Sequence, residues 1–204
     1  MSFDPAKPRF FVALLPPAAI ADYANGVIRE LGDRFQTRTA KAPPHVTLQP
    51  PFVWPMAQVA DLERCLGAFA GSQAAVPVCL SGFGAFAPRV LYINVLKTPA
   101  LMALQAELSA ELEQTLGIVD AKGKQRGFSP HMTVASRNLT PQVFKQAWPL
   151  LQARSPDPSL NPSPDPSPNP SLEHSLEEQF MGDRLTLLIH DGQQWQIQSE
   201  FRLS

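Results

Sequence analysis

The chain has 204 residues, 44% of them hydrophobic, which is enough to bury the core of one domain or of two small lobes. With 17 basic and 18 acidic residues, its formal net charge is −1, which excludes the overall basic field typical of proteins that bind long nucleic acids. The longest apolar run near the start, at residues 10–15, ends at two prolines and is too short to span a bilayer, so we expect a soluble cytoplasmic protein without a signal peptide.

The first half of the chain predicts alternating strands and helices. Residues 9–15 are rich in Phe, Val and Leu and predict a buried strand. Residues 17–35 carry apolar side chains at helical spacing after an initial proline, which favours a helix. We then expect a strand that starts at His45, a helix over residues 56–70 and a strand over residues 76–86.

The second half repeats the order of strand, helix and strand. Residues 89–96 predict a strand, and residues 98–116 predict a helix with Thr98 as its N-cap and Pro99 at its first position. Another strand is expected to start at His131. The elements expected at the end of the chain are a helix over 141–153 capped by Thr140, and a hairpin of residues 184–190 and 194–203 that turns at Asp191-Gly192.

Residues 155–171 interrupt this pattern. They consist of SPDPSLNP, a copy of it with one change, and one more serine, and they contain seven prolines. Such a segment cannot form a regular hydrogen-bonded ladder and has almost nothing apolar to bury. We therefore expect a flexible insertion over residues 155–175 within a single bilobal domain that spans residues 1–204. A docking segment for a proline-binding partner is the alternative interpretation.

Two copies of one short motif stand out, PHVTL at residues 44–48 and PHMTV at residues 130–134. On a β-strand, side chains two positions apart share a face, so His45 lies beside Thr47 and His131 beside Thr133. Because each motif follows a strand and a helix, a fold with a pseudo-twofold axis would place the two motifs opposite each other.

This set of side chains suits phosphodiester chemistry. An imidazole gives or takes a proton near neutral pH, so one histidine can activate a water while the other protonates a leaving oxygen. Threonine hydroxyls can donate hydrogen bonds to phosphate oxygens, where charge accumulates in the transition state. The scheme requires no metal or other cofactor. Two structural histidines are the alternative, but they would leave the matched threonines unexplained.

The paired motifs resemble those of the two-histidine (2H) phosphoesterases. GFGAFAPRVLYINV at residues 82–95 and RLTL at residues 184–187 are similar to the bacterial 2′–5′ RNA ligase-like branch, also described as RNA 2′,3′-cyclic phosphodiesterases. The resemblance covers nearly the whole chain outside the proline-rich segment. It implies an α+β fold of duplicated strand–helix–strand lobes, with two antiparallel sheets around a central cleft.

The resemblance also implies roles for the motif residues. His45 and His131 would be the catalytic acid–base pair, and Thr47 and Thr133 would bind the phosphate. The substrates would be RNA ends or small nucleotides with a 2′,3′-cyclic phosphate, opened by water to leave a 2′-phosphate, and 2′–5′ RNA ligation would be a related transfer. We prefer His131 as the base and His45 as the acid, although the sequence leaves the reverse open.

Arg137 is a further candidate for binding the phosphate. Many relatives have an arginine five residues after the second histidine, where this chain has Ser136. On a regular strand the shift of one residue turns Arg137 to the opposite face, whereas a bulge would restore its direction. A surface arginine that starts a loop is the alternative.

Aromatic and basic residues near the motifs complete the candidate site. Phe52, Trp54 and Phe128 are candidates to stack on a base, with packing in the core as the alternative for each. Residues 121–137 hold four basic residues and no acidic residue, so we expect this loop to guide an anionic substrate. His190 is interpreted as a residue at the end of a strand, without a function.

Other functions remain open from the sequence alone. They are a phosphodiesterase for the cyclic phosphate of ADP-ribose or for 2′–5′ linkages, and a nucleotide- or RNA-binding module without catalysis. A metal site is disfavoured because only two histidines converge, and because Cys65 and Cys79 lack metal-site spacing and are expected to be reduced and buried. We expect a monomer that does not bind membranes.

Overall fold

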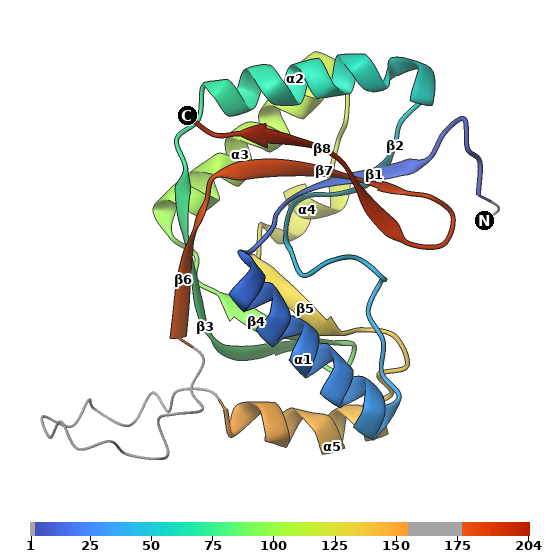
Figure 1. The fold of residues 1–204 in the computed structure, drawn as a ribbon, viewed down its shortest axis with the longest axis vertical. Helices are drawn as coiled ribbons and strands as arrows, with labels where there is room; N and C mark the ends of the chain where they lie inside the picture. The colour runs from blue at the N-terminus through green and yellow to red at the C-terminus, as the bar shows by residue number, and fades with distance from the viewer. Residues whose placement is uncertain (1–2, 155–176) are drawn as a thin grey trace, which may run out of the picture.

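The computed structural model describes residues 3–154 and 177–204, and it is an α+β fold built on two sheets (Figure 1). Each sheet has four antiparallel strands, in the orders β2-β1-β7-β8 and β5-β4-β3-β6. The expected fold class is therefore confirmed. The expected flexible insertion at residues 155–175 lies outside the described residues.

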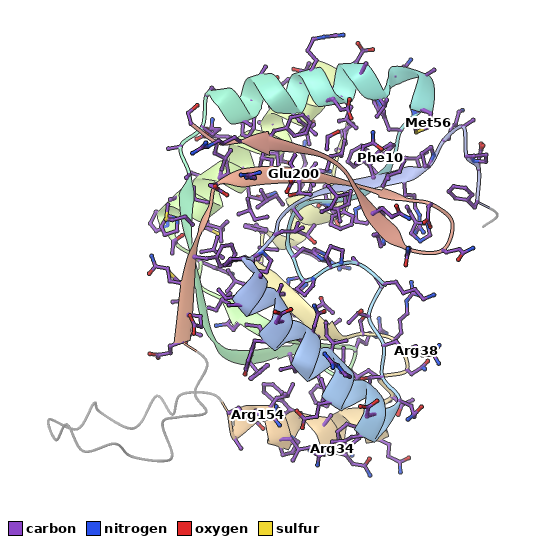
Figure 2. All side chains as sticks on the ribbon, viewed as in Figure 1. Phe10, Arg34, Arg38, Met56, Arg154 and Glu200 are labelled. Atoms are coloured by element: carbon purple, nitrogen blue, oxygen red, sulfur yellow. The ribbon has the colours of Figure 1, made fainter. Side chains whose placement is uncertain are left out.

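The first sheet buries one face under two helices. Its strands are β1 (Arg9–Leu14), β2 (Val46–Val53), β7 (Arg184–His190) and β8 (Trp195–Arg202). On β1, Phe10, Val12 and Leu14 are fully buried in the main core, where Phe10 lies beneath α2 (Figure 2). The covering helices are α2 (Val59–Gly71), which follows the short 3₁₀ helix η1 (Met56–Gln58), and α3 (Pro99–Leu116).

The second sheet is covered by two other helices. Its strands are β3 (Val76–Phe86), β4 (Val90–Val95), β5 (His131–Ala135) and β6 (Glu177–Gly182), and its helices are α1 (Ala18–Phe35) and α5 (Pro141–Gln152). The Arg154 guanidinium donates to both carboxylate oxygens of Glu30, at 2.8 and 2.7 Å, and so links the end of α5 to α1.

Helices α1 and α3 connect the two sheets. Helix α1 follows β1 of the first sheet but packs on β5 of the second, whereas α3 follows β4 of the second sheet and packs on both β2 of the first sheet and β3 of the second (Figure 1). Each sheet therefore packs against a helix that follows a strand of the other sheet. The edge strands β2 and β5, which carry the two motifs, contact each other.

Local sequence signals predicted most elements correctly. The Thr98 hydroxyl caps α3 by accepting from Leu101 N at 3.3 Å, and the Thr140 hydroxyl caps α5 by accepting from Val143 N at 3.2 Å. Asp191 forms the turn of the last hairpin, where its Oδ1 accepts from Gln193 N and Gln194 N, both at 2.8 Å.

Two elements were not predicted. The start of the expected basic loop is a helix, α4 (Ala121–Arg126), because Asp120 Oδ1 accepts from Gly123 N at 2.9 Å and caps it. Lys124 forms an ion pair there with Glu113 of α3. Because the Glu113 carboxylate offsets the charge of Lys124, this lysine contributes less to attracting an anionic substrate than expected from sequence. Strand β6 pairs with β3 and buries Phe180, although its first residues are polar.

The two cysteines differ in burial. Both are free thiols, but only Cys65 is buried, whereas Cys79 is half-exposed on the face of β3 opposite to the core residues Val78 and Leu80. The expectation that both are buried is therefore wrong for Cys79. Within the described ranges, no helix is both long and apolar enough to cross a membrane.

Candidate active site

The fold brings the two histidine motifs together. His45 immediately precedes β2 and His131 begins β5, and these two edge strands contact each other. The charge on His131 contributes to lowering the pKa of His45, so the two imidazoles lie within electrostatic reach of each other.

Each imidazole is oriented by the same hydrogen bond. His45 Nδ1 lies 2.6 Å from the carbonyl oxygen of Pro43, and His131 Nδ1 lies 2.8 Å from that of Ser129. A carbonyl oxygen only accepts, so Nδ1 carries a proton in both rings. The Nε2 atom of each histidine is therefore the nitrogen left to give or take a proton.

Burial makes both histidines weaker bases than a free imidazole. It lowers the pKa of His45, which the charge on His131 lowers further, and it also lowers the pKa of His131. The hydrogen bonds to Pro43 and Ser129 act in the opposite direction, because they stabilise the charged rings. Burial dominates, so both rings favour the neutral form near pH 7.

The two threonines of the motifs share a face with the histidines. Thr47 lies opposite Ala13 of β1, and Thr133 lies opposite Tyr92 of β4. Both threonines are half-buried, and neither hydroxyl has a hydrogen-bond partner within residues 3–154 and 177–204. Both hydroxyls are therefore available to donate to a ligand.

The structure does not bring the candidate aromatic residues to the histidines. Phe52 lies near the far end of β2 and Trp54 just after it, up to roughly 23 and 30 Å along the chain from His45 at about 3.3 Å per residue. Phe52 stacks on Phe10 of the core at 6.3 Å, and Trp54 Nε1 donates to Gln58 O at 2.9 Å. Both side chains pack against the main core, and a stacking role for them stays a prediction.

Phe128 also packs against the main hydrophobic core, although it lies three residues before His131. The structure therefore supports the alternative interpretation of Phe128 as a core residue. The contacts described for Phe52, Trp54 and Phe128 are with residues other than the two histidines.

Other aromatic rings contact the histidines instead. The ring of Phe11 lies 4.8 Å from that of His45, while the rings of Phe86 and Tyr92 lie 5.0 and 5.2 Å from that of His131. Phe86 is 40% exposed, so its ring offers an accessible surface beside His131. These residues are distant from the motifs in sequence, and only strand register brings them close, so sequence analysis missed them.

Gly84 makes room for Tyr92 at this site. It lies opposite Tyr92 in the β3–β4 pair, and a Cβ atom on Gly84 would stand 2.2 Å from the Tyr92 ring. We expect Gly84→Ala to displace this ring from His131, to lower the free energy of unfolding by about 1–3 kcal/mol and to reduce turnover. Chemical denaturation and turnover assays measure the two effects.

The control for this substitution is Gly26→Ala in α1, where no atom lies within 4 Å of the added Cβ. This variant should fold with equal or slightly higher stability, since alanine favours a helix. A Gly84→Ala protein with unchanged stability and unchanged turnover would show that Tyr92 has no positioning role.

Arg137 lies at an irregularity after β5, and its role as a phosphate ligand stays a prediction. Ser136 N and Arg137 N both donate to the carbonyl oxygen of Arg38, at 3.0 and 2.8 Å, so two residues oppose one, as in a β-bulge. The pKa of His190 on β7 is lowered chiefly by burial and by the charge of Arg9, with a smaller effect from the charge of the exposed Arg137. The Arg137 charge is therefore within electrostatic reach of the first sheet.

His190 is the last residue of β7, as expected from sequence. Its ring lies 4.9 Å from that of Trp195, which in turn lies 4.6 Å from Phe11 beside His45.

No group of three His, Cys, Asp or Glu side chains that could hold a metal ion is found in the part of the chain that the structure describes.

A protein-family model matches most of the chain. The model of the 2′-5′ RNA ligase superfamily matches residues 16–194, which include both histidine motifs. Among curated proteins, "Putative phosphoesterase Bcer98_0945" of Bacillus cytotoxicus is 30% identical over 128 residues, covering 62% of this chain and 68% of that protein. A Bacillus pumilus protein described as a "Putative phosphoesterase" is 30% identical over 132 residues, covering 63% of this chain and 70% of the Bacillus protein.

Solved structures share the fold at low sequence identity. The protein TT0787 of Thermus thermophilus matches with a TM-score of 0.59 and 18% identity, over 96% of this chain and 97% of that protein. Apo LigT of E. coli matches with a TM-score of 0.58 and 18% identity, over 98% and 99% of the two chains. LigT has also been solved in complexes with 3′-AMP and with phosphate.

Proposed function

The chain belongs to the 2′-5′ RNA ligase superfamily, and from this premise we propose that it is a metal-independent phosphodiesterase that opens 2′,3′-cyclic phosphates on RNA ends or nucleotides. The observation that carries the proposal is the matched pair of imidazoles, each fixed through Nδ1 and each left with a free Nε2. One ring can deprotonate water while the other protonates the leaving oxygen. Complexes of LigT with 3′-AMP and phosphate support a ligand of this chemical class.

The reaction exchanges one phosphorus–oxygen bond for another. The base takes a proton from water as its oxygen bonds to phosphorus, the bond from phosphorus to the ribose 3′-oxygen breaks, and the acid gives its proton to that oxygen. The product carries a 2′-phosphate. In ligation, a ribose hydroxyl of a second strand replaces water. The Thr47 and Thr133 hydroxyls donate to the non-bridging oxygens, where negative charge grows in the transition state.

The environments of the two rings favour His45 as the base and His131 as the acid. His45 is the more deeply buried, and the charge of a protonated His131 lowers its pKa further. We therefore assign the shared proton of the free protein to His131 as part of this proposal. This assignment is the reverse of the one preferred from sequence, which had no information on burial.

The proposal is tested with a panel of nucleoside 2′,3′-cyclic phosphates in the presence of EDTA. We expect turnover that EDTA does not reduce, and a 2′-phosphate product identified by ³¹P NMR. Oligonucleotides with a cyclic phosphate end, the cyclic phosphate of ADP-ribose and a 2′–5′-linked dinucleotide complete the panel. Binding without product on every substrate would identify a binding module, and loss of turnover in EDTA would identify a metal enzyme.

The pH dependence of kcat/KM follows from the two lowered pKa values. Catalysis needs the singly protonated pair, with one acid and one base. Because both pKa values lie below the ordinary value of about 6.5, this state is populated below pH 6.5 and is lost as the pH rises through that range. We expect kcat/KM to reach its maximum below pH 6.5. A profile measured in EDTA that rises continuously to pH 8 would contradict this assignment.

A further inference from the structure

Strand β2 carries a β-bulge immediately after Thr47. Thr47 lies opposite Ala13 of β1, and the next pair along the two strands is Gln49 opposite Val12. Leu48 is skipped, so two residues of β2 stand against one residue of β1, which is the pattern of a β-bulge. A bulge redirects the side chains beside it, and a shift of the pairing by one residue would turn Thr47 to the other face. The bulge therefore sets the direction of the Thr47 hydroxyl.

Strand β5 carries a bulge at the equivalent place in the second motif. Thr133 lies opposite Tyr92 of β4, and the next pair along the strands is Ala135 opposite Leu91, so Val134 is skipped. In both motifs the regular ladder is therefore interrupted at the residue after the threonine. Because the irregularity recurs at the same position, we attribute it to the geometry of the motif and not to a chance defect of one strand.

A side chain of α3 supports the bulge of the first motif. Gln105 Nε2 donates to the carbonyl oxygen of Leu48 at 3.2 Å. Leu48 is only 1% exposed, so without this donor a buried acceptor would be left unpaired. The neighbouring Gln49 is equally buried, and its Oε1 already lacks a hydrogen-bond partner in the described part of the chain. The hydrogen bond from Gln105 therefore opposes any rearrangement of this bulge.

The helix that covers the second motif offers no such donor at the matching position. Helix α1 packs on β5 as α3 packs on β2. The two helices carry inward-facing residues at the same spacing, namely Ile20, Ala24, Val27 and Leu31 on α1, and Leu101, the half-buried Gln105, Leu108 and Leu112 on α3. Ala24 takes the place of Gln105, and a methyl group cannot donate a hydrogen bond. At this position, only the first motif is tied to its covering helix.

We infer that Gln105 is a positioning residue, which fixes the bulge through the Leu48 carbonyl and so aims the Thr47 hydroxyl at the phosphate. This inference rests on the proposed function and adds a residue to its machinery. Leu48 faces the core under α3, whereas Thr47 faces the opposite side with His45, so Gln105 acts through the backbone and touches no substrate. Because the direction of a donor matters most where negative charge grows, loss of Gln105 should reduce kcat more than it changes KM.

The first test is Gln105→Met, which keeps the length of the side chain and its preference for a helix but removes the donor. We expect kcat for a nucleoside 2′,3′-cyclic phosphate to fall about tenfold, with KM within about twofold of the wild type. Gln114→Met, at an exposed position of the same helix, is the matched control and should change neither constant. Thr98→Ala removes the N-cap of α3 and controls for lost stability, because it should lower the midpoint of denaturation and leave kcat unchanged.

Double variants identify the group through which Gln105 acts. If this group is Thr47, Gln105→Met should lower kcat less than about twofold in a Thr47→Val protein, where the hydroxyl is already absent. In a Thr133→Val protein it should keep its effect of about tenfold. Equal losses in the two threonine backgrounds, or an unchanged kcat in Gln105→Met alone, would overturn the inference.

The inference and the proposed function fail in different ways. If the wild type turns over no cyclic phosphate, the proposed function fails, and the support of the bulge by Gln105 is then judged by amide hydrogen exchange, which needs no substrate. We expect exchange at residues 46–50 to be about tenfold faster in Gln105→Met, the scale of one hydrogen bond, and unchanged at residues 131–135. Unchanged exchange at the first bulge, or equal acceleration in both motifs, would reject the inference.

Discussion

Replacement of His45 or His131 by asparagine is expected to lower kcat for nucleoside 2′,3′-cyclic phosphates by about 10²–10⁴-fold, since each removes one proton-transfer group. The amide of asparagine can still donate to the carbonyl of Pro43 or Ser129, which retains the local packing. Single-turnover assays in EDTA measure the loss, and circular dichroism shows whether the fold is kept.

The two histidines should behave as a unit. If each ring acts only with the other, the double variant loses little more activity than either single variant, because one missing proton transfer already disables the pair. The matched control is His174→Asn, since this histidine has no threonine two residues later. Turnover that survives both substitutions would reject two-histidine catalysis, even for a protein of this family.

Local signals explain why so much of this fold could be predicted. The Thr98 and Thr140 caps, the Asp191 turn and the alternation of buried and half-exposed residues along β4 are all encoded within a few neighbouring residues. The same holds for the two motifs, because a strand places His and Thr two residues apart on one face whatever surrounds it.

Long-range register explains what could not be predicted. Tyr92 reaches His131 only because β4 pairs with β5, and Phe11 reaches His45 only because β1 pairs with β2. Proximity in sequence pointed instead to aromatic residues such as Trp54, which the direction of β2 carries away from the site. The packing of α1 on the second sheet and of α3 on both sheets is equally invisible in hydrophobic periodicity, which identifies a buried face but not its partner.

Removal of a motif hydroxyl should also affect the chemical step more than binding. We expect Thr47→Val and Thr133→Val each to lower kcat by about 10²–10³-fold, the effect of removing one donor to a developing negative charge. Valine has nearly the same shape as threonine, and neither hydroxyl has a partner within the described residues, so the fold should be unaffected. Steady-state kinetics on a cyclic nucleotide separate kcat from KM.

Serine distinguishes the hydroxyl from the shape of the side chain. Thr47→Ser and Thr133→Ser keep the donor and lose only a methyl group, so kcat should stay within about tenfold of the wild type. Thr115→Val on α3, whose hydroxyl donates to Glu111 at 2.7 Å away from the histidines, is the control and should have wild-type activity. If valine raises KM at constant kcat, the hydroxyls bind the ground state and the transition state equally well, and the stabilisation of developing charge must come from the two imidazoles alone.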